Sequence, residues 1–557
     1  MSSNANFSVW FRQDFVTSMF LPTPASTPLS NCDRVQRMVA YAKEKSQFPQ
    51  FNQKFWIRSA SMKLQAKESK AKAYFSAFCD LCERIEVSRK KSLKENNNSL
   101  FSGNTSVPAL PFLLSLYLQN ANRRRIQDSI TDAHPSQTRV EDLSGRNPER
   151  QLVQFARDKD SITKLFRILA VAESHVPKYK QINADDLTKS LSLSTITALD
   201  FVFEGCAGDA PAATSLFSEL VRQFLPPLPG RDSEYSIGNL IDLLKSSLTI
   251  SPWSIAYSDS SHRLSVTDRL SLSPSAPATS PLSSKSLTLS AARRRFYGNF
   301  KSATGQQRTF LLSKLNSQTL CLHSTRLYGC TVNICDTLHA HVYLILPLRD
   351  VIIRKCWNSH IFIGAISGVL RIEQCVDCDI IAVCSRALIA NCKRVRLHLQ
   401  TIKKPLLMSS ITDVQLGPHN ANYAGLQAHL TKCGLDDVSA SNNVFDKPIF
   451  VDEKEGNAYS RQLVPTFFEF RVPFVNVATS KPPLWLPRDF VDGQKVIKNS
   501  LDGLEKFLVD QNLDEADSAQ LVETILQRFS GWLRDSGADR ELSQLVQMTE
   551  KSCFGNS

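Results

Sequence analysis

A short repeat between residues 327 and 417 is the feature that most constrains the fold of this chain. Cys356, Cys375 and Cys392 recur at intervals of 19 and 17 residues, and each precedes a short run of alternating apolar and polar residues. A further unit, 409–416, lacks the cysteine and keeps the alternation. A period in the high teens is too short for a pair of helices and fits one coil of a β-solenoid.

The repeat also predicts what the interior of the solenoid contains. Equivalent residues of successive coils lie above one another, so the three cysteines should form a buried ladder of small side chains. Small or polar residues are expected at the corners of the coils, at Gly364, Gly368, Asn391 and Ser409.

The composition sets the broad class of partner. The 557 residues carry a formal net charge of +13, which favours acidic partners such as nucleic acid, anionic lipid or acidic protein tails. The arginine triplets at 123–125 and 293–295 are interpreted as solvated loops. No run of about 18 apolar residues is present, so we expect no transmembrane segment. The first residues lack the pattern of a signal peptide, so the 14 cysteines are expected to be reduced thiols.

Shifts in composition predict four regions. They are a helical N-terminal region at 1–256, a flexible linker rich in Ser and Pro at 257–295, a β-helix domain at 296–450, and an extended segment with C-terminal helices at 451–557. The linker contains Ser273-Pro274 and Ser280-Pro281, which are candidate phosphorylation sites. Helices are expected at 61–94, 109–118, 152–170, 215–225, 237–248 and 517–533, followed by a short one at Leu542 and Leu545. The tail is expected to pack on the solenoid or cover its open edge.

Three groups of residues have the residue types of a catalytic or metal-binding site, but the surrounding sequence does not support such a site. Cys79 and Cys82 form a C-x-x-C pair that has no partner pair. A possible zinc set is formed by Cys330, Cys335, His339 and His341, but ordinary packing in a coil explains these residues better. Asp377 and Asp379 could be paired carboxylates, although no second acidic pair accompanies them. We therefore expect no metal site and no cofactor.

The repeat resembles a known family. The segment Gly364–Ile380 is similar to the tubulin-binding cofactor C domain, also called the C-CAP/cofactor C-like domain, and the resemblance extends over about residues 310–430. It implies a right-handed parallel β-helix, so the expected fold class is α+β multidomain. The stretches 445–448 and 529–537 are similar to one subfamily, the TBCC domain-containing protein 1 group. That similarity implies a cytoplasmic and cytoskeletal protein of the centrosome, basal body or spindle pole that affects Golgi position and cell shape.

The same resemblance raises the question of catalysis. Active members accelerate GTP hydrolysis by tubulin or an Arf-like GTPase with an arginine finger, in the pattern Gln-Gln-x-Arg after a coil cysteine. A guanidinium there neutralises charge that develops on the transferred phosphoryl group. Aligning Cys384 with that cysteine puts Leu388 at the finger position. Arg386 lies two residues earlier, which displaces its head by roughly 6–7 Å along a strand, so we expect no enzyme activity.

Basic residues of the coils are the candidate binding site. Several recur at equivalent coil positions and could form one stripe that attracts the acidic tails of tubulin, although ordinary solvation of outward residues is the alternative. These residues are Arg354, Lys355, Arg371, Arg386, Lys393, Arg394 and Arg396.

Three functions follow from these observations. The first is a non-enzymatic cytoskeletal organiser whose β-helix binds tubulin, a small Arf-like GTPase or centrosomal proteins. The second is a GTPase-activating protein that uses Arg386. The third, a nucleic-acid binder, is disfavoured because no nucleic-acid-binding motif accompanies the basic charge.

Overall fold

The structure is a computed structural model, and two regions expected from the sequence lie largely outside the part it describes. The linker at 257–295 is outside it except for Arg295, and so are Leu542 and Leu545. The described residues are 7–19, 21, 30–93, 106–122, 148–174, 190–207, 214–251, 295–298, 309–322, 325–408, 410–423, 425–435, 443–451, 459–464, 470–471, 484, 486–510 and 515–536.

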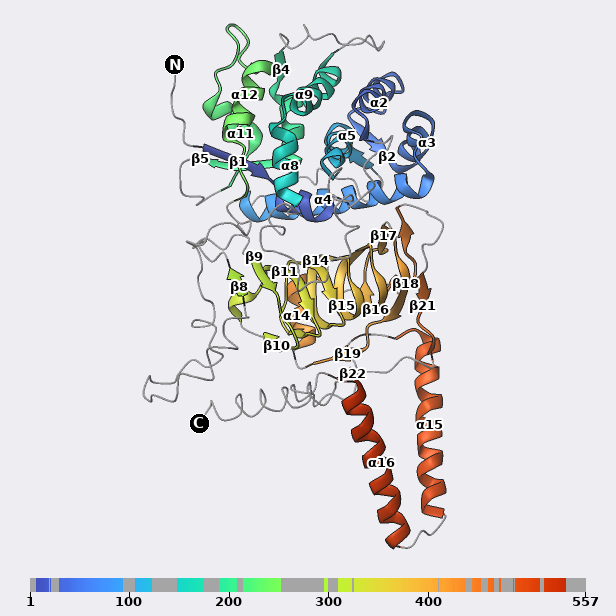
Figure 1. The fold of residues 1–557 in the computed structure, drawn as a ribbon. Helices are drawn as coiled ribbons and strands as arrows, with labels where there is room; N and C mark the ends of the chain where they lie inside the picture. Colours follow the sequence, from blue (N-terminus) through green and yellow to red (C-terminus); the bar gives the residue numbers. More distant parts are fainter. Residues whose placement is uncertain are drawn as a thin grey trace, which may run out of the picture.

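Helices dominate the N-terminal domain, residues 7–251 (Figure 1). They are α1 (Gln13–Ser18), α2 (Cys32–Glu44), α3 (Gln53–Leu64), α4 (Glu68–Leu93), α5 (Ala109–Leu118), α8 (Pro148–Arg157), α9 (Lys159–Glu173), α10 (Leu193–Ile196), α11 (Phe217–Phe224) and α12 (Ile237–Ser247). Antiparallel strands join distant parts of the domain. These are the sheet of β1 (Phe7–Phe11), β5 (Phe203–Ala207) and β6 (Ser215–Leu216), and the pairs β2 (Gln50–Asn52) with β3 (Ser106–Pro108) and β4 (Ser190–Ser192) with β7 (Glu234–Ser236).

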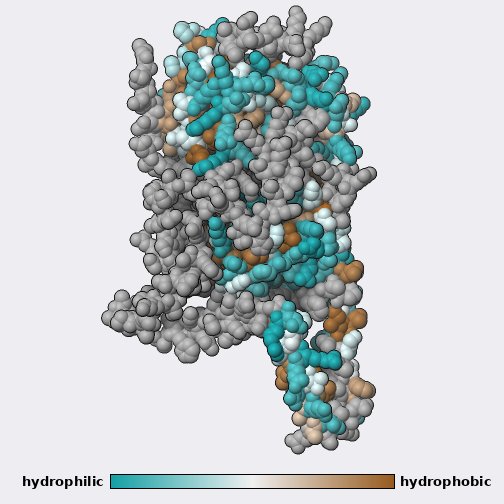
Figure 2. Space-filling model, viewed as in Figure 1, coloured by the Kyte–Doolittle hydropathy of each residue, from teal (hydrophilic) through white to brown (hydrophobic). Residues whose placement is uncertain are grey.

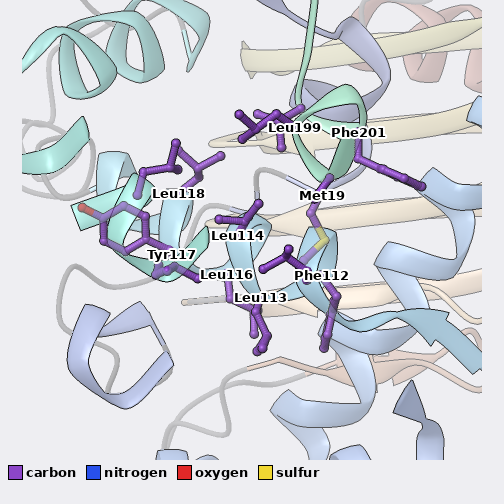
Figure 3. Packing of buried hydrophobic residues seen from close by; sticks show 14 of the residues in the cluster. Met19, Phe112, Leu113, Leu114, Leu116, Tyr117, Leu118, Leu199 and Phe201 are labelled. Atoms are coloured by element: carbon purple, nitrogen blue, oxygen red, sulfur yellow. The ribbon is translucent and has the colours of Figure 1, made fainter. Parts of the chain in front are cut away.

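The core of this domain surrounds α5, which is buried on all sides as its apolar sequence predicts. Phe112 of this helix packs edge-on against Trp56, with the ring centroids 4.6 Å apart. Figure 3 shows Met19, Leu199 and Phe201 converging on the same helix from other parts of the chain. The predicted helix at 61–94 is instead two helices, because Gln65 adopts a left-handed conformation that ends α3 before α4 begins.

A parallel β-solenoid of about six turns follows, which confirms the expected fold class. Its first edge is β8 (Arg295–Gly298), which pairs antiparallel with β9. The parallel strands are β9 (Thr309–Ser313), β10 (Thr319–Leu322), β11 (Thr331–Leu338), β12 (His341–Leu344), β13 (Asp350–Trp357), β14 (His360–Glu373), β15 (Val376–Ala390), β16 (Lys393–Thr401), β17 (Leu406–Met408), β18 (Thr412–Pro418), β20 (Ile449–Phe450) and β21 (Tyr459–Arg461). A helix, α14 (Leu426–Cys433), packs on one outer face, and β19 (Ala421–Asn422) pairs with β22 (Phe470–Arg471).

One corner of the coils is built in the same way throughout the solenoid. Two residues three positions apart have positive φ there, as Asn391 and Arg394 do, and six such pairs occur among the described residues. The residue after the first member points inward. Cys356, Cys375 and Cys392 occupy this inward position and are buried, so the predicted cysteine ladder is confirmed. Each thiol donates to the carbonyl two residues earlier, at 3.5, 3.4 and 3.3 Å respectively.

Gly364 and Gly368 lie within the long strand β14, between the segment that pairs with β12 and the segment that pairs with β13. The register of β14 with β15 shifts at both glycines, which agrees with the predicted corner, and close packing also requires glycine there. A Cβ atom on Gly364 would lie 2.6 Å from the Tyr423 hydroxyl oxygen, and one on Gly368 would lie 2.3 Å from a carboxylate oxygen of Asp350.

Two helices of the C-terminal tail, α15 (Arg488–Asp510) and α16 (Glu515–Ser536), extend away from the solenoid (Figure 1). The start of α15 is anchored, since Phe490 is buried and Asp489 accepts a hydrogen bond from Arg461 at 2.5 Å. The side chains of α16 are exposed along nearly all of the described helix. The expectation that this helix packs back on the solenoid was therefore wrong. No helix in the described part of the chain is long and apolar enough to cross a membrane.

Candidate interaction surface

Helix α4 is the part of the N-terminal domain that lies along the solenoid (Figure 1). It presents apolar side chains to the core of its own domain and polar side chains to the solenoid. Phe75, Phe78 and Cys82 point into the N-terminal core. Ser76 and Asp80 contact the solenoid instead. Because residues four apart share one face of a helix, one helix serves both purposes.

A first cluster of charges in this interface is centred on Asp80. Arg386 of β15 forms an ion pair with Asp80, and a second guanidinium nitrogen of Arg386 donates to the Ser76 hydroxyl at 2.6 Å. Lys403 donates to the other carboxylate oxygen of Asp80 at 2.6 Å and also pairs with Glu83. Arg386 is 3% exposed, and each of its three guanidinium nitrogens donates a hydrogen bond within the molecule.

A second cluster joins α1, α4 and the start of β13. Arg84 bridges Asp14 at 2.8 Å and Asp350 at 2.5 Å, and Arg349 also contacts Asp14 at 2.5 Å. The other oxygen of Asp350 accepts the backbone N–H of Val369 at 2.9 Å. Both acids are buried and each has a cation beside it, as a buried charge requires.

Apolar side chains of the solenoid also contribute to the interface, where they belong to the same hydrophobic cluster as the N-terminal core. Leu388, which the family resemblance aligns with the arginine finger, is 1% exposed and belongs to the hydrophobic cluster of the N-terminal domain. It lies in register with Arg371 on one side and Leu406 on the other. The solenoid residues that join this cluster are Val369, Leu388, Ala390, Leu406, Met408 and Val451. The face that carries Leu388 is therefore covered by the N-terminal domain.

The basic residues predicted to bind a partner do not form one exposed stripe. Arg371 is buried like Arg386, where it pairs with Glu373 and donates to the backbone carbonyl of Val16 at 3.1 Å. Arg354 contacts the same glutamate at 3.0 Å and is half-buried. Arg371 and Arg386 contact the N-terminal domain from outward positions of β14 and β15, in the strand segments that precede the corner of positive-φ residues.

The other four predicted binding residues lie at or beyond that corner. Lys355 is half-buried and Lys393 is exposed. Arg394 makes a two-pronged contact with Asp377 at 2.5 and 2.6 Å, and Arg396 makes the same contact with Asp379 at 2.5 and 2.7 Å. This exposed corner therefore carries both signs of charge. The two aspartates are partners of arginines and not a catalytic carboxylate pair.

The candidate metal ligands stay apart in the described part of the chain, where no three His, Cys, Asp or Glu side chains come close enough to hold an ion. Cys335 and His341 lie on successive strands on either side of a corner, and His339 forms that corner. Cys82 belongs to the N-terminal core, as its helical spacing indicates. Burial raises the pKa of the Cys79 thiol to about 12, so this thiol is a poor thiolate ligand.

The ion-pair residues of the N-terminal domain were not predicted from the sequence. Asp14, Asp80 and Arg84 are separated from their solenoid partners by several hundred residues, for example 306 between Asp80 and Arg386. The available signal was a charged face on an otherwise apolar helix. Such a face is usually solvated, so the sequence gives no reason to pair it with the coils.

The acids of the interface have pKa values that reflect their partners. Burial alone would raise the pKa of Asp14, but the cations of Arg349, Arg84 and Arg12 together hold it well below its usual range. Burial acts in the same direction on Asp80, and Arg386 and Lys403 again lower the pKa overall. Both carboxylates are therefore ionised at neutral pH.

This arrangement predicts that acid weakens the full-length protein through these groups. A carboxyl whose pKa is lower in the folded than in the unfolded state stabilises the fold above the unfolded value of about 3.9, and this contribution declines as pH falls further. Replacing Asp14 by Asn should therefore reduce the pH dependence of the free energy of unfolding below about pH 4. Urea denaturation at several pH values between 5 and 3 measures how the free energy of unfolding depends on pH. The exposed Asp242→Asn is the control, and an equal slope in all three proteins would contradict the assignment.

Comparison with known proteins agrees with the fold. Residues 329–447, which span most of the solenoid, match the family model described as tubulin binding cofactor C. The chain is also similar along nearly its whole length to TBCC domain-containing protein 1 of several vertebrates. Identity is 24% to the Danio rerio protein, covering 97% of this chain and 94% of that protein. It is 25% to the Mus musculus protein, covering 94% and 95% respectively.

The similarity to the Homo sapiens protein of the same name is 24%, covering 97% of both chains. The matches therefore include the N-terminal domain and the tail as well as the solenoid. Residues 329–447 match the tubulin binding cofactor C domain, and the chain as a whole is similar to the TBCC domain-containing proteins.

Proposed function

We propose that this chain is a non-enzymatic organiser of the cytoskeleton. It acts at the centrosome, basal body or spindle pole, where it helps to position the microtubule-organising centre and the Golgi and affects cell shape. The relatives are named for a tubulin binding cofactor C domain, which supports tubulin or a small Arf-like GTPase as the protein that the β-helix binds. The observation that carries the proposal is the N-terminal domain seated on the solenoid face of Leu388.

The chemistry of that face supports the proposed lack of catalysis. Leu388 offers no hydrogen-bond donor, and a GTPase could not reach it while the N-terminal core covers it. An arginine finger must extend its guanidinium into the nucleotide site of the partner. A buried leucine cannot replace it.

The alternative, a GTPase activator that uses Arg386, is disfavoured by the bonds of this side chain. Its guanidinium contacts Asp80, Ser76 and the backbone carbonyl of Lys404. Releasing it would leave Asp80 buried with only part of its compensating charge, which is costly. Arg386 thus acts as a structural link between the domains.

Partner binding is assigned to the exposed corner of the solenoid. Lys393, Arg394 and Arg396 lie there on one strand, β16, and are open to solvent, next to Asp377 and Asp379 of the neighbouring coil. The overall charge of +13 would draw an acidic partner towards the molecule. The alternating charges of the corner would then decide how the partner is oriented, because mixed charges penalise a wrong register.

Single-turnover GTP hydrolysis tests the absence of catalysis. Full-length protein should bind tubulin or an Arf-like GTPase without accelerating hydrolysis. Arg386→Ala should leave hydrolysis unchanged and lower the free energy of unfolding by about 3 kcal/mol, because it breaks a buried ion pair. Arg396→Ala, which removes an exposed pair, should cost less than about 1 kcal/mol. Acceleration of about 100-fold or more that disappears in Arg386→Ala would establish the activator instead.

Localisation tests the cellular part of the proposal. A tagged full-length chain should concentrate at the centrosome or spindle pole, and its depletion should displace the Golgi. The charge-reversal variant Lys393→Glu, Arg394→Glu should fold normally and lose this position, whereas Thr412→Glu at the same corner serves as a control for added negative charge. If the double variant has the same distribution in the cell as the wild type, the corner is not the binding surface.

A further inference from the structure

An apolar stripe runs along the projecting helix α16. Its five members are each more than half exposed, by 51% to 59%. They are Val522, Ile525, Leu526, Phe529 and Trp532. Figure 2 shows apolar side chains on this projecting part of the surface. Large apolar side chains gathered on one exposed helix face usually mark a contact with another molecule.

The spacing of the stripe identifies the kind of contact. Val522, Ile525, Phe529 and Trp532 follow one another at intervals of three, four and three residues, which is the spacing of a coiled-coil seam. The rings of Phe529 and Trp532 are stacked with their centroids 5.8 Å apart, so one end of the seam is a continuous aromatic surface. The other end is aliphatic.

The charges of the helix disfavour a lipid surface as the occupant. Helices that lie on anionic membranes carry Lys and Arg on their polar face. In α16 the acidic residues Glu515, Asp517, Glu523 and Asp535 outnumber the basic residues Arg528 and Arg534. A protein helix therefore fits this stripe better than a bilayer.

We propose that the stripe pairs with α16 of a second copy of this chain, in antiparallel orientation. Centred on Gln527, this pairing sets Val522 opposite Trp532 of the second copy and Ile525 opposite its Phe529, so each layer joins an aliphatic to an aromatic side chain. A parallel pair would set Trp532 against Trp532 and Val522 against Val522, with layers of unequal width. Knobs-into-holes packing needs layers of even width.

The area available is sufficient for a specific but moderate contact. Five half-exposed large side chains offer on the order of 100 Å² each, so two copies would bury roughly 1,000 Å² in total. This value is close to the lower limit of about 1,000–1,200 Å² for specific interfaces. The dimer is therefore expected to be a weak one that dissociates on dilution.

Analytical ultracentrifugation of the full-length chain tests the pairing. The wild-type chain should show a concentration-dependent mass that approaches twice that of one chain. Ile525→Glu should abolish the larger species, and Thr524→Glu, which adds the same charge one residue away on the exposed polar side, should retain it. A wild-type chain that stays monomeric throughout, or two glutamate variants that dimerise equally, would overturn the proposal. Co-sedimentation of the wild-type monomer with anionic phospholipid vesicles would also overturn it.

Cysteine cross-linking tests the orientation. Under mild oxidation, a mixture of Val522→Cys and Trp532→Cys chains should form disulfide-linked dimers in several-fold greater yield than either variant alone. The wild-type chain gives the background from the native cysteines, which are buried or half-buried wherever they are described. Efficient linkage of each variant with itself, and none in excess in the mixture, would contradict the antiparallel arrangement.

Discussion

The ion pairs between α4 and the outward residues of the coils are the contacts on which the domain arrangement depends. Asp80 and Asp14 are buried, and much of the positive charge that compensates them comes from the solenoid, through Arg386, Lys403 and Arg349. An isolated N-terminal domain would lose these partners, and a buried carboxylate without a partner is strongly destabilising. Apolar side chains such as Leu388 fill the space beside the charges. Breaking any one of these ion pairs would leave a buried charge without its partner, and this cost holds the two domains together.

This contact divides the surface of the β-helix into parts with different roles. Each coil has outward-facing residues at equivalent positions on every face of the solenoid. Whether such a residue is buried or exposed depends on whether another part of the chain packs on that face. Arg386 and Arg396 are both coil arginines paired with aspartate, yet one is buried between domains and the other is open to solvent. Helix α14 covers another face through Leu426 and Leu430. The corner of positive-φ residues is exposed at Lys393 and Arg394, and it is the surface that we propose binds a partner.

Features set by local repetition could be predicted from the sequence. The cysteine ladder follows from the coil period, and the fully buried α5 follows from its apolar run. Features set by contacts between distant segments could not. The burial of Arg371 and Arg386 depends on α1 and α4, which precede them by some 300 residues or more. In the tail, the sequence predicts the helix that forms α16, but the periodicity of its apolar residues does not say which molecule covers the apolar face.

A double-mutant cycle between Asp80 and Arg386 in the full-length chain tests the central claim most directly. The free energies of unfolding of Asp80→Ala, Arg386→Ala and the double variant would be compared with that of the wild type. If the N-terminal domain is seated on the solenoid through this pair, the double variant should lose less than the sum of the single losses, by a coupling energy of about 1–3 kcal/mol. Additive losses, within about 0.5 kcal/mol, would contradict the interface and leave the face of Leu388 open.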